Sequence, residues 1–167
     1  RDLKPSNIIV DALDQPHITD FGLAKRLDNS QPSTLNPQLT LSGQVLGSPA
    51  YISPEQAGGR SRDVGPASDI YSLGALLYHL LTGRPPFVSQ SLSEILQQVA
   101  RDEPLSPQLL NVSVPRDLAI VCLKCLEKNP DDRYASAGLF AEDLRRFLEN
   151  RPTQARPVSA WYRASRW

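Results

Sequence analysis

Several residue types are scarce or missing in this sequence of 167 residues. It has no methionine, two histidines and two cysteines. Cys122 and Cys125 stand three residues apart, which excludes a disulfide framework and fits a reducing, cytoplasmic setting. No run of about 18 apolar residues occurs, so the sequence predicts no membrane span. The opening Arg-Asp-Leu-Lys is neither an initiator methionine nor a signal peptide.

The formal net charge of the chain is zero. The 18 basic and 18 acidic residues cancel, which argues against nucleic acid as a partner because nucleic-acid binding needs a strongly basic face. The balance is uneven along the chain, however. Residues 151–167 carry four arginines and no acid, so residues 1–150 have a net charge of 0 − 4 = −4.

What is present predicts a β-hairpin followed by helices. Two β-type runs, residues 8–10 and 17–19, are separated by a turn-rich spacer over 11–16. Residues 28–48 are polar and rich in Ser, Thr, Pro and Asn, which is typical of a long loop. Apolar residues at three- and four-residue spacing then predict a helical bundle, with helices over residues 70–81, 92–99, 118–126 and 139–148. The fold class is α+β, mainly α.

Particular residues predict where these helices start and stop. Gly83 ends the first helix, Pro115 opens the third, and Ser136 is the expected N-cap of the fourth. Cys122 and Cys125 fall inside the third helix on its apolar side. The prediction for both cysteines is therefore core packing, and a redox or zinc role is the weaker alternative.

Two acids, a lysine and an amide lie close together near the start. Asp2, Lys4 and Asn7 share one loop, and Asp20-Phe21-Gly22 begins thirteen residues after Asn7. Moving a phosphoryl group from ATP to an alcohol depends on positioning and charge stabilisation. Asp2 can orient and deprotonate the hydroxyl, while Lys4 can offset charge on the phosphoryl group. Asp20 and Asn7 offer the hard oxygen ligands that Mg²⁺ prefers. These residues predict a site for ATP and Mg²⁺.

In this order and spacing, the motifs resemble the C-terminal lobe of bacterial eukaryotic-like (Hanks-type) protein serine/threonine kinases. Asp2 to Asn7 is similar to the catalytic loop, Asp20-Phe21-Gly22 to the magnesium motif, and Ser53-Pro54-Glu55 to the Ala-Pro-Glu that closes the activation segment. Lys4 two residues after Asp2 favours serine/threonine over tyrosine specificity. The sequence opens inside the catalytic loop, so we expect the N-terminal lobe to be absent and this chain alone to be inactive.

The resemblance implies further roles around this centre. Asp69 would hold the backbone of the catalytic loop, as the corresponding aspartate does in the family. Arg133 would form a structural ion pair with Glu55. Ser48 would lie next to the bound substrate. Protein hydroxyls of serine and threonine are thus the expected acceptors, with ATP as the donor.

The loop over residues 28–48 is expected to be a phosphorylated activation loop. Thr40 and Ser42 match hydroxyls that receptor-type bacterial kinases autophosphorylate, and a homodimer is the expected arrangement for that step. A phosphate adds nearly two negative charges and can dock on cations. Arg1 and Lys25 match the family's cations for this purpose, so phosphorylation is expected to order the loop.

Two alternatives to a protein kinase stay open. One is a pseudokinase-like scaffold that binds partners without catalysis. The other is a small-molecule phosphotransferase, which ranks lower because such an enzyme should lack the Ser53-Pro54-Glu55 segment and a phosphorylatable loop.

The division of the chain follows from these motifs. Residues 1–150 are expected to form the C-terminal lobe of a kinase, and residues 151–167 a tail. In the tail Trp161, Tyr162 and Trp167 alternate with arginines, which suits contact with the cytoplasmic face of a membrane. A solvated linker is the alternative interpretation of the tail.

Overall fold

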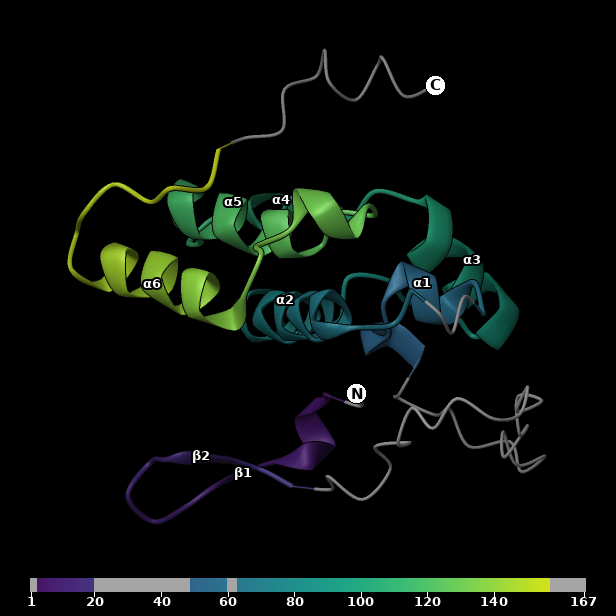
Figure 1. Cartoon of the computed structure of the whole chain (residues 1–167), viewed down its shortest axis with the longest axis horizontal. Helices are drawn as coiled ribbons and strands as arrows, with labels where there is room; N and C mark the ends of the chain where they lie inside the picture. The colour runs from purple at the N-terminus through teal and green to yellow at the C-terminus, as the bar shows by residue number, and fades with distance from the viewer. Residues whose placement is uncertain (1–2, 20–48, 60–62, 157–167) are drawn as a thin grey trace.

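The computed structural model describes residues 3–19, 49–59 and 63–156. Over these ranges it confirms a mainly helical fold with one small antiparallel sheet (Figure 1). The strands are β1 (Ile8–Val10) and β2 (Pro16–Ile18). The α-helices are α1 (Pro54–Ala57), α2 (Pro66–Thr82), α3 (Leu92–Arg101), α4 (Pro107–Leu110), α5 (Arg116–Cys125) and α6 (Ala137–Leu148). Short 3-10 turns are η1 (Pro5–Asn7), η3 (Pro49–Tyr51) and η4 (Pro130–Asp132).

The predicted hairpin forms, with its second strand one residue earlier than expected. Ile8 pairs with Ile18 across the two strands. The tight turn depends on Asp11, whose Oδ1 accepts the backbone N–H groups of Leu13 at 2.8 Å and Gln15 at 2.9 Å. These hydrogen bonds, together with one from His17, hold the pKa of Asp11 below its usual value. The turn is therefore an ordered connector of fixed length.

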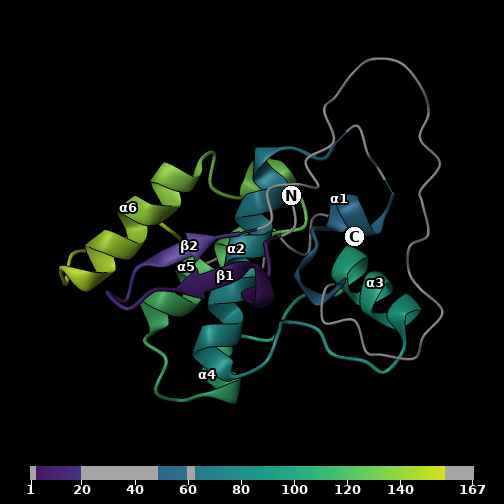
Figure 2. The same ribbon diagram turned by 90° about the horizontal axis from the view of Figure 1, so that it is seen from below.

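Helix α2 is the central element. In Figure 1 the hairpin lies on one side of α2 and α5 on the other, and Figure 2, turned by 90°, shows the hairpin lying over α2. Pro66 occupies the first turn of α2, and Gly83 ends the helix in the left-handed region at φ 76°. The predicted end at Gly83 is confirmed, because a residue without a side chain adopts this conformation at little cost.

Two core clusters flank the crossing of α2 and α5. The first joins α2 to η3 and α3, and the second joins α2 and α5 to α6. Cys122 belongs to the first cluster and Cys125 to the second, and both thiols are free and fully buried. Burial raises the pKa of both thiols. The predicted packing role of the cysteines is confirmed.

The remaining long helices agree with the sequence pattern, and two short ones were missed. Helix α6 begins where predicted, with Ser136 Oγ accepting the N–H of Leu139 at 3.2 Å. Helices α1 and α4 were not predicted. Each has four residues and starts at a proline, so neither is long enough to show an apolar repeat.

The segment of residues 151–156, called the exit segment below, has no helix or strand but packs on the domain. Thr153 and Ala155 are buried, and Ala155 joins the second core cluster. The carboxylate of Asp143, on α6, accepts the N–H groups of Gln154 at 2.6 Å and Ala155 at 2.9 Å. Within the described residues, no helix is both long enough and apolar enough to cross a membrane.

Candidate active site

The hairpin brings Asn7 next to Thr19, the last described residue before the Asp-Phe-Gly motif. Asn7 closes η1 and is buried, and its N–H bonds the carbonyl of Lys4 at 3.0 Å. The N–H of Thr19 donates to the carbonyl of Asn7 at 2.8 Å. Thr19 directly precedes Asp20 in the sequence. The stretch from Lys4 to Asn7 therefore lies beside the residue that leads into the Asp-Phe-Gly motif.

Only some of the predicted site residues lie in the described part of the chain. Lys4 is half-buried, and Asn7 is buried at the end of η1. The predicted residues outside the described ranges are Arg1, Asp2, Asp20, Lys25, Thr40, Ser42 and Ser48. Over residues 3–19, 49–59 and 63–156, no group of three His, Cys, Asp or Glu side chains could hold a metal ion. The Asn7 amide and the Asp20 carboxylate are the residue types that suit Mg²⁺, so their role as its ligands stays a prediction.

The turn η3, which directly follows Ser48, is firmly attached to α2. All three of its residues are buried. The hydroxyl of Tyr51 and Nδ1 of His79 are 2.5 Å apart, and Ser72 Oγ donates to the carbonyl of Tyr51 at 2.8 Å. The segment next to the predicted substrate position is thereby fixed to the central helix.

Helix α1 follows η3 and starts with a reciprocal cap. The N–H of Ser53 donates to Gln56 Oε1 at 2.9 Å, and the N–H of Gln56 donates to Ser53 Oγ at 3.4 Å. Such a capping box satisfies two backbone donors at a helix start. Ser53, which stands where the family resemblance expects alanine, supplies the cap.

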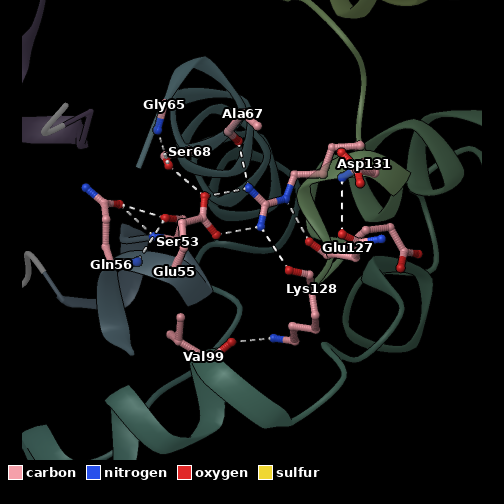
Figure 3. A network of polar contacts seen from close by, with 12 residues as sticks. Ser53, Glu55, Gln56, Gly65, Ala67, Ser68, Val99, Glu127, Lys128 and Asp131 are labelled. Carbon is pink, nitrogen blue, oxygen red and sulfur yellow. Dashed lines mark hydrogen bonds and ion pairs between the residues drawn. The ribbon is translucent and has the colours of Figure 1, made fainter. Parts of the chain in front are cut away.

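Glu55 and Arg133 form a buried bidentate ion pair (Figure 3). Both N–O distances are 2.9 Å, and the two side chains are almost completely inaccessible. Burial by itself would raise the pKa of Glu55, but hydrogen bonds from Arg133 and Ser68 outweigh it and lower the pKa to about 2. The carboxylate stays ionised although it is buried.

The guanidinium of Arg133 uses all of its N–H groups. Besides its two bonds to Glu55, it donates to three backbone carbonyls, those of Ala67 at 2.8 Å, Glu127 at 2.8 Å and Lys128 at 3.1 Å. An arginine has five N–H donors. Arg133 thus joins α1, the start of α2 and the segment after α5 in one network.

The comparison with known proteins decides the family. The protein kinase domain model matches residues 1–144. This chain belongs to the protein kinase family. Serine/threonine-protein kinase PknB of Mycobacterium leprae is 39% identical over 158 residues, which is 95% of this chain and 24% of that protein. PknB of Mycobacterium tuberculosis strain H37Rv and of Mycolicibacterium smegmatis match with the same identity and coverage.

The resemblance inferred from the sequence is therefore confirmed: the relatives are bacterial serine/threonine kinases. The chain spans about a quarter of the length of these curated relatives. Members of the kinase family use ATP and Mg²⁺ in general.

Asp69 of this kinase domain lies in the first turn of α2 and is half-buried. An acidic residue is favourable there because the N-terminus of a helix carries partial positive charge. Its role toward the catalytic loop stays a prediction.

Sequence reasoning missed three residues of the network around Arg133. Ser68 Oγ donates to Glu55 Oε1 at 2.6 Å. The ring of Tyr71 lies 5.1 Å from the Arg133 guanidinium carbon, and Lys128 accepts through its carbonyl. Ser68 and Tyr71 stand three residues apart and therefore share one face of α2, but no sequence signal specified their partners.

Proposed function

We propose that the full-length gene product containing this chain is a protein serine/threonine kinase that transfers the γ-phosphoryl group of ATP to serine and threonine hydroxyls of proteins. The observation that carries the proposal is the 2.8 Å hydrogen bond from Thr19 N–H to the Asn7 carbonyl. It supports the convergence of the catalytic loop and the magnesium motif, which phosphoryl transfer requires. Family membership and bacterial kinase relatives support it independently.

In this proposal each residue has one task. Asp2 orients the substrate hydroxyl and accepts its proton as the hydroxyl oxygen bonds to phosphorus and the bond to ADP breaks. Lys4 stabilises the negative charge of the moving phosphoryl group. Asn7 and Asp20 hold Mg²⁺, which when bound neutralises charge on the phosphate oxygens.

Regulation and placement belong to the proposal as well. Thr40 and Ser42 are proposed sites of autophosphorylation between two copies of the protein, with Arg1 and Lys25 as the docking cations. Ser48 is the proposed substrate neighbour. The lobe over residues 1–150 is proposed to work in the cytoplasm. Residues 151–167, of which the exit segment packs on the domain, are proposed to contact the membrane face through Trp161, Tyr162 and Trp167.

The test is an Asp2→Asn substitution in the full-length gene product. We expect Mg²⁺-dependent transfer from γ-labelled ATP to casein, and to the protein's own Thr40 and Ser42, to fall by roughly 10²–10⁴-fold because a general base is lost. Rates are measured by label incorporation, with phosphosites mapped by mass spectrometry. Unchanged turnover in the variant refutes the role of Asp2. A wild-type protein that folds and transfers no phosphate refutes the kinase and favours the scaffold.

A further inference from the structure

Lys128 lies between α5 and η4, and its side chain reaches away from both. Its Nζ donates to the carbonyl of Val99, in the last turn of α3, at 2.7 Å. The same ammonium is 4.5 Å from the ring centre of Phe87 and 5.9 Å from that of Tyr71. Cations are attracted to aromatic faces at such distances. The Lys128 ammonium thus makes one charge-assisted hydrogen bond and two contacts with aromatic rings.

The end of α3 needs this partner. The last four backbone carbonyls of a helix have no hydrogen-bond donor within the helix. At the end of α3, the N–H of Asp102 donates to the carbonyl of Gln98 at 2.8 Å, and the Lys128 ammonium donates to the carbonyl of Val99. A cation is also favourable at this end because the helix dipole places partial negative charge there. Lys128 therefore acts as the C-terminal cap of a helix that is remote from it in sequence.

Lys128 is itself held by the ion-pair network. Arg133 donates to the Lys128 carbonyl, while the Lys128 ammonium donates to Val99. A continuous path thus runs from Glu55 through Arg133 and Lys128 to α3, and Figure 3 labels Glu55, Lys128 and Val99 along it. Helix α3 packs directly against α1 and η3. The path and the packing together enclose the segment that follows Ser48.

We propose that Lys128 is a positioning residue that sets α3 against η3 and α1, and through them shapes the surface that receives the protein substrate. The inference rests on the proposed function for its substrate class. The placement of α3 is independent of the proposed function, because it is argued from the contact between Lys128 and Val99.

The electrostatic surroundings agree with a cation at this position. Burial lowers the pKa of Lys128 to about 8, while the nearby carboxylates of Glu103 and Asp102 raise it in part. The ammonium is therefore still the dominant form at neutral pH. A charged donor makes a stronger hydrogen bond to a carbonyl than a neutral one.

Lys124 provides a matched control. It is a lysine four residues earlier, on α5, and its ammonium also lies 4.5 Å from an aromatic ring centre, that of Tyr134. Tyr134 packs with Phe140 of α6. Substitution of Lys124 therefore removes a similar cation and ring contact on the α6 side, away from α3.

The first measurement is amide hydrogen exchange of the full-length protein as wild type, Lys128→Met and Lys124→Met. We expect Lys128→Met to speed exchange over Gln98 to Arg101 by about tenfold or more relative to α6, because a hydrogen bond to a charged group is lost. Lys124→Met should leave α3 exchange at the wild-type rate. Equal α3 exchange in the two variants, or a rise shared by α3 and α6, overturns the proposal.

The second measurement separates substrate binding from chemistry. With casein as the protein substrate, Lys128→Met should raise its KM by about three- to tenfold, while KM for ATP and kcat change less than twofold. An equal change in both KM values overturns the role in substrate placement. If the wild-type protein has no kinase activity, the proposed function fails, and the exchange experiment still decides the placement of α3.

A third variant covers the case in which Lys128→Met does not fold. Lys128→Gln keeps a polar donor and removes the charge. A rise in exchange confined to α3 in this variant supports the proposal. Wild-type exchange, or a rise throughout the domain, overturns it.

Discussion

At the scale of single residues, Arg133 shows how a buried charge is tolerated. Removing a guanidinium from water is costly unless its donors are satisfied and its charge is paired. Arg133 meets both conditions through Glu55 and three backbone carbonyls. Breaking such a pair from one side leaves the other charge buried and costs roughly 3–5 kcal/mol. The pair therefore fixes the position of α1 more than it adds net stability.

Acid should weaken the fold through Glu55. Its pKa is about 2 in the folded protein against an ordinary value of 4.5. The lowered pKa contributes stability that is complete above the ordinary value and is lost as pH falls toward 2. Relative to protonated Glu55 in the same fold, the contribution of the ionised carboxylate is on the order of 3 kcal/mol. Urea unfolding of the wild type between pH 6 and about 3 should show this fall.

Glu55→Gln isolates the effect, because glutamine has the same shape and does not titrate. The variant should be less stable at neutral pH and should lose less stability on acidification. Parallel pH profiles of the two proteins would show that Glu55 does not cause the acid sensitivity.

At the scale of elements, the crossing of α2 and α5 depends on the absence of one side chain. A Cβ built on Gly74 would lie 2.4 Å from Cβ of Cys125. The thiol of Cys122 donates to the carbonyl of Gly74 at 3.5 Å. The two helices can approach this closely only with glycine at position 74.

Replacing Gly74 by alanine should therefore destabilise the protein although alanine favours helices. We expect a loss of about 1–3 kcal/mol from overpacking. Gly138→Ala in α6 is the control, since a Cβ there meets only Ser136 Oγ at 3.7 Å. That control should gain roughly 0.5–1 kcal/mol from helix propensity. Thermal unfolding measures both, and a stabilised Gly74→Ala would contradict the close crossing.

The sequence predicts elements where a repeat is long enough to be seen. The apolar spacing of α2, α3, α5 and α6 identified all four helices. Gly83 located the end of α2, and Ser136 located the start of α6. Helices α1 and α4 have no such repeat. The capping box of Ser53 and Gln56 was the available signal for α1, because a Ser with Gln three residues later marks a helix start.

At the scale of the whole molecule, the exit segment is part of the domain because Asp143 binds it. The carboxylate also accepts the hydroxyl of Tyr134 at 2.8 Å and is buried. Position 143 lies on the apolar side of α6, three residues after Phe140. An acid on an apolar helix face was the one sequence signal of this contact, and its partners, which lie in backbone N–H groups, leave no trace in a sequence.

Asp143→Asn should release the exit segment. The amide of asparagine would place an N–H₂ group against donors that now bind the carboxylate. We therefore expect the free energy of unfolding to fall by about 1–3 kcal/mol and hydrogen exchange at Gln154 and Ala155 to become faster. Tyr134→Phe removes one donor and keeps the ring packing, so a loss of about 1 kcal/mol is expected. If exchange at Ala155 stays at the wild-type rate in Asp143→Asn, the carboxylate does not hold the segment.

The order of motifs along the chain was enough to predict the ion pair of Glu55 and Arg133, which the structure confirms. The same order predicts the catalytic roles of Lys4 and Asn7, which stay predictions. Lys128 could not be predicted, because its partner is a main-chain carbonyl in α3 and any residue at position 99 offers the same oxygen. Contacts of a side chain with the backbone depend on the fold alone.

The hairpin between Asn7 and Thr19 also works as a spacer of set length. Its register pairs Ile8 with Ile18, so each added or deleted residue in a strand shifts the later motif by one step and reverses the face on which its side chains project. Within the turn, Asp11 carries the hydrogen bonds that fix the backbone, and the other positions can vary as long as their number does not. Substitution at the exposed tip of the hairpin is therefore expected to be tolerated, whereas insertion or deletion within a strand is not.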